Sequence, residues 1–167
     1  MDTKSRIVAD FQFIGYKVDN IKFSVIPSVT ILQRREICNE DSFQFKLNIR
    51  SPQRLSNSDN EIAYVGGLDI KVRILTTIND KKKVIAKGNF GIAGVFKKIG
   101  DMPKAQEEYM VKATIPSILL GYLRSTISST FANAGFGSFI IPLINISNIV
   151  KDTNIQIVDA QGTPVEL

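Results

Sequence analysis

The ionisable side chains of this sequence offer little support for catalysis. The chain has no histidine, so proton transfer at neutral pH would depend on carboxylates or lysines with shifted pKa values. The nearest carboxylate pairs are Asp59/Glu61 and Glu107/Glu108, and both lie in stretches that are typical of solvated loops. We therefore expect no catalytic residue and predict that the protein is not an enzyme.

Nucleophilic, metal and nucleotide chemistry have no better support. Cys38 lies between Glu36 and Glu40, and acidic neighbours raise the pKa of a thiol. A single cysteine without histidine forms no soft-ligand metal site and no internal disulfide, which indicates a reducing compartment. The glycines within 88–94 lack the spacing of a phosphate loop. We expect no cofactor and no metal, and we assign these glycines to a strand that bends or that another chain approaches closely.

Alternating apolar residues in the first half of the chain predict four strands. The first contains Ile21, Phe23 and Val25, and Pro27 marks its edge or end. The clearest alternation covers 43–50, with Phe43, Phe45, Leu47 and Ile49 on one face. The polar stretch 51–60 is typical of a connection, and strands over about 64–74 and 84–92 form a hairpin at Asn79-Asp80. Four successive antiparallel strands are the simplest arrangement.

The second half begins with a helical period. Apolar and small residues recur every three or four positions, Pro116 suits a first turn, and Gly135 suits the residue just past a helix end. The sequence predicts a helix from about Pro116 to Asn133, whose stripe packs on one face of the sheet. The stripe consists of Leu119, Tyr122, Leu123, Thr126, Ile127 and Thr130. We expect an α+β fold with one domain over 1–167, a core over about 14–150, and a poorly ordered tail at 151–167 with at most one short element.

An uncharged stretch from Ser125 to Val150 is long enough to span a bilayer. Many of its residues are polar, and Gly135, Gly137 and Pro142 interrupt it, so burial in protein or against a partner fits better than membrane insertion. The first residues carry charges and lack the apolar run of a signal peptide. We expect a cytoplasmic protein.

The net charge of +5 permits contact with nucleic acid or with an acidic surface. Clusters occur at 34–35, 81–83 and 97–98, and the middle cluster is typical of a solvated hairpin turn. A nucleic-acid-binding module would need aromatic side chains interleaved with cations on one exposed face. Phe43 and Phe45 alternate with Lys46, which places them on the opposite face of the strand and favours a core position.

The order of these elements resembles the SecB family of export chaperones. The matching stretches are VDNIKFSV, KVIAKGNFGIAGVFKKIG, and TIPSILLGYLRSTISSTFANAGF leading into FIIPLIN, and they extend from about Asp19 to Asn148. The helix and crossover pattern of the family is matched by Pro116, Leu119, Tyr122, Arg124, Ser128 and Pro142.

This resemblance implies a homotetramer, a dimer of dimers, with the sheets outside and the long helices between subunits. It also implies that unfolded chains are held, without nucleotide, in apolar grooves built from the first strand and the crossover segment. Each candidate residue for this role could instead be a core residue, which for any single residue is slightly the better interpretation. The candidates are Phe23, Val25, Ile26, Phe136, Phe139, Ile140, Ile141, Leu143 and Ile146.

Two departures from the family leave three functions open. The family's translocase-binding surface is acidic, whereas these strands carry Lys46, Arg50, Lys71 and Arg73, which argues against docking on the motor ATPase SecA. The family's second helix is expected to be short or absent after Asn148. The functions are a general holdase for unfolded polypeptides or preproteins, a dedicated chaperone of one partner such as an antitoxin or a phage-defence component, and a basic nucleic-acid-binding module.

Overall fold

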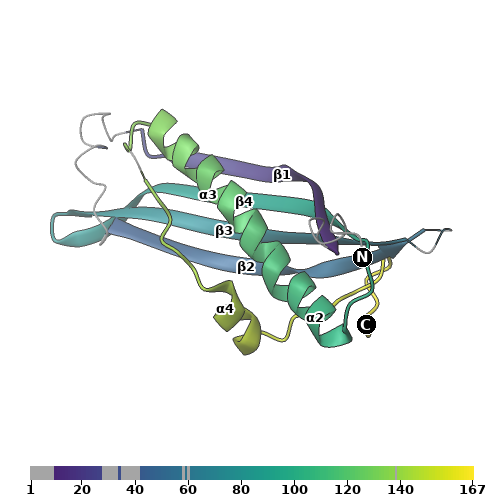
Figure 1. The fold of residues 1–167 in the computed structure, drawn as a ribbon. Coiled ribbons are helices and arrows are strands. Elements are labelled where there is room, and N and C mark those ends of the chain that lie inside the picture. Colours follow the sequence, from purple (N-terminus) through teal and green to yellow (C-terminus); the bar gives the residue numbers. More distant parts are fainter. Residues whose placement is uncertain (1–9, 28–33, 35–41, 58, 60, 138) are drawn as a thin grey trace.

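Four long antiparallel strands form the centre of the molecule (Figure 1). The structure is a computed structural model that describes residues 10–27, 34, 42–57, 59, 61–137 and 139–167. All four strands predicted by the alternation are present and are longer than expected. They are β1 (Phe11–Val25), β2 (Phe43–Ser56), β3 (Ile62–Ile78) and β4 (Lys81–Lys98).

The strands do not follow one another in space, so the predicted successive arrangement is wrong. Their order is β1-β4-β3-β2, and β1 pairs with β4 from Phe11 opposite Lys98 to Val25 opposite Ala86. Only β2–β3 and β3–β4 are neighbours both in sequence and in the sheet, which gives a Greek key. Residues 26–42 connect β1 to β2, and a connection of that length can carry the chain across the sheet at small entropic cost.

The helical layer begins earlier than the sequence indicates. It consists of α2 (Lys104–Tyr109), the π-helical turn η3 (Met110–Thr114) and α3 (Ile115–Asn133). The predicted helix from about Pro116 to Asn133 corresponds to α3, whereas α2 and η3 before it were not predicted. A proline inside a helix lacks an N–H and clashes with the carbonyl four residues before it. The wider π turn directly before Pro116 relieves that conflict, so the helix continues through the proline.

The helix ends at Asn133, as predicted, and glycine makes this end possible. Gly135 has φ of 86°, a conformation that other residues adopt only with strain. Its N–H donates to the Ala132 carbonyl at 3.0 Å, and the Phe136 N–H donates to the Phe131 carbonyl at 3.1 Å. These two bonds form a Schellman motif, and the rings of Phe131 and Phe136 meet edge to face at 5.9 Å. The motif fixes the direction in which the chain leaves the helix.

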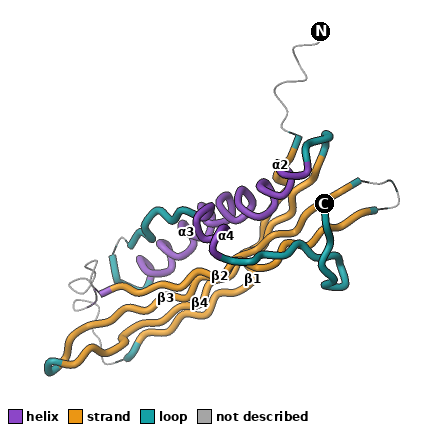
Figure 2. Tube along the Cα trace, turned by 90° about the horizontal axis from the view of Figure 1, so that it is seen from below, coloured by secondary structure: helices purple, strands orange, loops and turns teal. Residues whose placement is uncertain are grey.

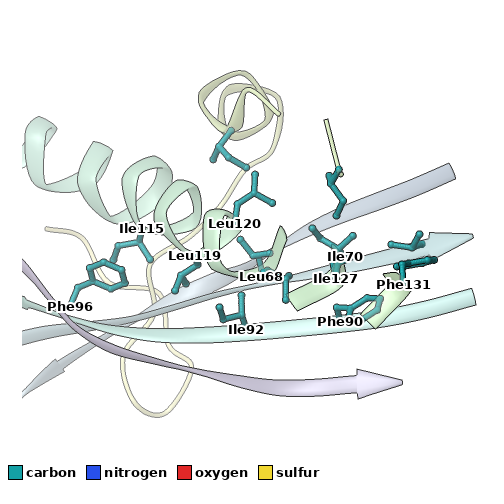
Figure 3. Close-up of a cluster of buried hydrophobic side chains, with 14 of the residues drawn as sticks. Leu68, Ile70, Phe90, Ile92, Phe96, Ile115, Leu119, Leu120, Ile127 and Phe131 are labelled. Atoms are coloured by element: carbon teal, nitrogen blue, oxygen red, sulfur yellow. The ribbon is translucent and has the colours of Figure 1, made fainter. Parts of the chain in front are cut away.

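The helices cover one face of the sheet and leave the other face open (Figure 2). Side chains of α3 point into the sheet and form a continuous core with β3 and β4 (Figure 3). Gly94 on β4 lets the helix come close, because a Cβ there would lie 2.6 Å from Leu119 Cδ2. This confirms the predicted α+β class. Tyr122, which was assigned to the buried stripe, is instead exposed.

Strand β2 continues beyond Pro52, so the predicted connection over 51–60 is wrong. The register shifts between Arg50 and Gln53, and pairing with β3 then resumes as far as Ser56. Pro52 is tolerated because β2 is an edge strand. The tail lies along this edge: the Val158 N–H donates to the Pro52 carbonyl at 2.9 Å, and the Arg54 N–H donates to the Val158 carbonyl at 2.7 Å. Residues around Val158 thus add a short parallel bridge to the sheet.

The uncharged stretch 125–150 is divided among three structural contexts. It contains the end of α3, an irregular segment over 134–145, and the start of α4 (Ile146–Asp152). In the part of the chain that the structure describes, none of the helices has the length and apolar character needed to cross a membrane.

Candidate functional site

The segment 134–145, between α3 and α4, separates the candidate residues into two groups. Phe136, Ile141 and Ile146 are buried in the core. Ile140 and Leu143 point outward, with 68% and 88% of their surface exposed. The described residues of this segment, 134–137 and 139–145, form no helix or strand, so neighbouring residues follow no fixed alternation. It therefore contributes both to the core and to an apolar surface.

A cluster of phenylalanines holds this segment against the sheet. Phe131, at the end of α3, is fully buried, and its ring centroid lies 4.9 Å from that of Phe23, 5.8 Å from that of Phe43 and 5.3 Å from that of Phe139. Phe43 and Phe139 stack at 3.6 Å. The two edge strands, the helix end and the segment thus meet in one aromatic cluster. We call the half-buried Phe139 and the exposed Ile140 and Leu143 the crossover surface.

Arg34 fixes the end of α3 from another part of the chain. Its Nη1 donates to the Ala134 carbonyl at 2.9 Å, and its guanidinium carbon lies 5.8 Å from the centroid of the Phe136 ring. A cation that binds the last carbonyls of a helix also complements the helix dipole. Sequence reasoning treated Arg34 only as surface charge. Its neighbour Arg35 and the lone Cys38 lie outside the described residues.

The end of β1 contributes a second apolar feature. Phe23 and Val25 are half-buried, whereas Ile26 is exposed. A hollow of about 470 Å³ opens beside Val25 and Ile26. Its other lining residues are Ser24, Pro27, Arg73, Val84, Ile85, Ala86 and Lys87. Phe23 does not line this hollow but belongs to the aromatic cluster below the crossover surface, so the first strand contributes to both features.

A separate apolar strip follows β1 and the solvent side of α3. The rings of Tyr16 and Tyr122 stack at 4.3 Å, and Ile21 and Ile118 are exposed on the same two elements. We call these four residues the β1–α3 strip. Tyr16 was missed in the sequence because Val18 to Ile21 contains a register shift that interrupts the alternation.

The carboxylate pair Glu107/Glu108 does not lie in a loop, and its first member is buried. Glu107 accepts hydrogen bonds from the Tyr64 hydroxyl and, at 2.6 Å, from Lys98 Nζ. Burial acts to raise the pKa of Glu107, but the bonds from Lys98 and Tyr64 outweigh it and hold this pKa below its usual value. Burial and the Glu107 carboxylate raise the pKa of Tyr64. Their hydrogen bonds join α2 to β3 and β4.

We expect the change Glu107→Gln to lower the free energy of unfolding at pH 7 by about 2 kcal/mol, because Lys98 loses its charged partner. A carboxylate with a lowered pKa contributes stability above its unfolded pKa of about 4.3, and this contribution is lost as the pH falls through the folded pKa. The difference between variant and wild type should therefore shrink in acid. Urea unfolding measured at pH 7 and near pH 3 tests this expectation.

The matched control for this test is Glu108→Gln. Glu108 is exposed and pairs with Lys112 one helical turn away, so its loss should change stability by no more than about 0.5 kcal/mol. Equal losses in the two variants, or a Glu107→Gln deficit that persists in acid, would contradict the role given to the buried carboxylate.

Three features of the described residues expose apolar side chains. Among the described residues, no three His, Cys, Asp or Glu side chains gather where a metal ion could be held. These features are the crossover surface, the β1–α3 strip and the end of β1, and the hollow at the end of β1 is also lined by Ser24, Arg73 and Lys87.

The chain belongs to the SecB family. The family model described as preprotein translocase subunit SecB matches residues 18–156. The family consists of chaperones and not of enzymes. A protein-export protein SecB of Nitrosomonas eutropha is 31% identical over 112 residues, which cover 65% of this chain and 69% of that protein. One of Dechloromonas aromatica is 24% identical over 102 residues, which cover 61% of this chain and 64% of that protein.

The fold also matches a solved structure of the same kind. That structure is a SecB-like chaperone of Mycobacterium tuberculosis in complex with a ChAD peptide from the HigA1 antitoxin. The match has a TM-score of 0.54 and 14% sequence identity, and it covers 80% of this chain and 90% of the other. The resemblance of the element order to SecB is therefore confirmed by family, relatives and fold.

Proposed function

We propose that this SecB-family chaperone holds non-native polypeptides on the crossover surface and at the end of β1, without ATP, in the cytoplasm. The exposure of Ile140 and Leu143 on an irregular, uncharged segment is the observation that supports this proposal most strongly. Isolated exposed apolar residues are common, but two on one segment next to a half-buried phenylalanine offer a continuous contact.

The chemistry of this surface suits clients of varied sequence. Burial of apolar area is favourable by roughly 25 cal/mol per Å² and has no directional requirement. The stretch 125–150 has no charged side chain that would have to lose its water on contact. A client could therefore present many different apolar residues to Phe139, Ile140 and Leu143. The candidates Phe136, Ile141 and Ile146 support this surface from the core and do not contact the client.

The β1–α3 strip is the part of the molecule that we propose to be covered by other copies of the chain. The solvent side of α3 next to Tyr122 carries Gly121, Ser125 and Ser129, which are small, uncharged and exposed. Small residues on a helix allow a second helix to approach closely. This surface supports the homotetramer, a dimer of dimers, with helices between subunits and sheets outside.

Dedication to one partner, such as an antitoxin or a phage-defence component, is the second candidate. The Mycobacterium tuberculosis structure with the same fold holds an antitoxin peptide. The open face of the sheet carries Lys46, Lys71 and Arg73, so it does not offer the acidic surface that the translocase motor would bind. Nucleic-acid binding is not favoured, because Phe45 and Lys46 are neighbours on a strand and point to opposite faces.

One preparation, measured twice, tests the proposal. Light scattering should give a mass four times the 18.5 kDa of a single chain. The same sample, at stoichiometric amounts and without ATP, should stop a chemically unfolded protein from aggregating. A monomer that leaves aggregation unchanged would refute the chaperone proposal. Protection of an antitoxin encoded beside the gene, but of no unrelated protein, would favour the dedicated chaperone.

A further inference from the structure

Five cations gather on the face of the sheet that the helices leave open. The register places Lys46 opposite Lys71, and both share a row across the sheet with Asn89 and Lys22. The adjoining row consists of Gln44, Arg73, Lys87 and Ser24. Residues directly opposite in an antiparallel sheet point to the same side. We call Lys22, Lys46, Lys71, Arg73 and Lys87 the basic patch.

No acidic side chain neutralises this patch from within. All five cations are exposed, and among the described residues none of them forms an ion pair. The remaining members of the two rows are uncharged. Like charges at this spacing repel one another, so the patch is a place where an anion would relieve unfavourable interactions.

Two acidic side chains, Asp19 and Asp69, lie on this face next to the basic patch, and both already form ion pairs with Arg50. Arg50 reaches across the sheet and binds Asp69 through Nε at 2.9 Å and Asp19 through Nη1 at 2.6 Å. Its path requires glycine, because a Cβ at Gly91 would lie 2.5 Å from Arg50 Nη2. The hydrogen bonds from Arg50 lower the pKa of Asp19. Both carboxylates are therefore turned toward Arg50, and the basic patch faces solvent without them.

We propose that the basic patch docks an acidic segment of a second protein, which is distinct from the client held on the crossover surface. The patch spans three strand spacings, about 14 Å, and two rows, about 7 Å. About four extended residues cover that length, so a short stretch with several Asp or Glu would match the cations. The amides of Gln44 and Asn89 lie within the same rows and can donate further hydrogen bonds to carboxylates.

The chemistry of the patch favours a polypeptide over a nucleic acid. The two rows contain no aromatic side chain, so unpaired bases would have nothing to stack on. The patch lies on the open face of the sheet and the crossover segment lies on the face that the helices cover, so a peptide on the patch leaves the crossover surface free (Figure 2). The hollow at the end of β1 is not separate in this way, because Arg73 and Lys87 line it and also belong to the patch.

The test uses the full-length chain and a fluorescent peptide in which Glu and Ala alternate. Fluorescence anisotropy should report saturable binding at about 50 mM salt that is lost near 500 mM. The variant with Lys22→Gln, Lys46→Gln and Lys71→Gln, none of which lines the hollow at the end of β1, should bind the peptide about tenfold more weakly, since each exposed pair contributes modestly. The control carries Lys81→Gln, Lys82→Gln and Lys83→Gln, the same change of charge at the hairpin turn, and should weaken binding by less than about twofold.

Three further results decide between this proposal and its alternatives. Both triple variants should keep the melting temperature and the suppression of aggregation of the wild type, which separates this proposal from the chaperone function. The variant with Ile140→Asp and Leu143→Asp should bind the peptide as tightly as the wild type, and loss of peptide binding in that variant would overturn a docking surface separate from the crossover surface. Tighter binding of single-stranded DNA than of the peptide, lost in the patch variant, would overturn the assignment to an acidic protein. If both triple variants lost the same affinity for the peptide, binding would depend only on the net charge of the protein, and the proposed docking surface would be refuted.

Discussion

Replacement of both Ile140 and Leu143 by aspartate is expected to abolish the holding of unfolded polypeptide while the fold stays intact. The two side chains are 68% and 88% exposed, so charged replacements remain solvated in the free protein. In a complex the same positions would lose the burial of two aliphatic side chains, about 1.5 kcal/mol or more each, and would place two carboxylates against apolar groups. The affinity for an unfolded chain should fall roughly a hundredfold.

Anisotropy of a labelled, permanently unfolded protein measures this loss. Leu143→Asp alone should produce a large part of it. The control is Ile99→Asp, which changes another exposed isoleucine, located just beyond β4 and away from the crossover surface. If the double variant binds as tightly as the wild type, the client is held elsewhere on the molecule. Unchanged melting temperatures establish that any loss arises at the surface and not from unfolding.

The second large effect is expected from Phe131→Ala. This ring is fully buried and contacts those of Phe23, Phe43, Phe90, Phe136 and Phe139. Its truncation leaves a cavity between the sheet and the end of α3, and we expect the free energy of unfolding to fall by about 4 kcal/mol. Urea unfolding at one fixed protein concentration measures this loss, since assembly makes apparent stability depend on concentration.

Phe45→Ala provides the comparison for that measurement. Phe45 lies on β2 between the core residues Phe43 and Leu47 but is 41% exposed, and its truncation should change stability by no more than about 1 kcal/mol. Similar losses for the two phenylalanines would mean that the aromatic cluster does not join the helix end to the two edge strands.

The elements themselves were predictable because their signals are local. Alternation along 43–49 and 68–74 depends only on the two-residue period of a strand, and Gly135 is required by the backbone at the helix end. The order of the strands was not predictable in the same way. It depends on where residues 26–42 lead the chain, and no side-chain pattern in the strands specifies that β1 pairs with β4.

The helical residues before α3 were not predicted, because Pro116 was taken as the first turn of the whole helical layer. Pro116 is typical of a first turn, but it is equally tolerated after a π turn, and the sequence 104–115 does not distinguish the two cases. Glu107 was misjudged for the same reason. Once the helix begins at Lys104, Glu107 faces Tyr64 and Lys98 instead of solvent.

The candidate site was predictable as a region and not as individual residues. In an irregular segment the direction of each side chain depends on tertiary contacts, so Ile140 is exposed while Ile141 beside it is buried. The stacking of Phe139 on Phe43 joins parts of the chain that no local period relates. The contribution of Arg34 was hidden for the same reason, because its acceptor lies 100 residues away.

The pairing of β1 with β4 has a consequence for how this chaperone is made. During synthesis β1 cannot pair until β4 has been made, because Phe11 lies opposite Lys98 in the sheet. By contrast, β2, β3 and β4 can pair with one another as soon as they leave the ribosome. The apolar side chains of β1, such as Phe13, Phe23 and Val25, therefore remain exposed until β4 has been synthesised. They resemble the exposed apolar segments that the folded protein is proposed to bind. We therefore expect newly synthesised chains to be among the clients of copies that have already folded.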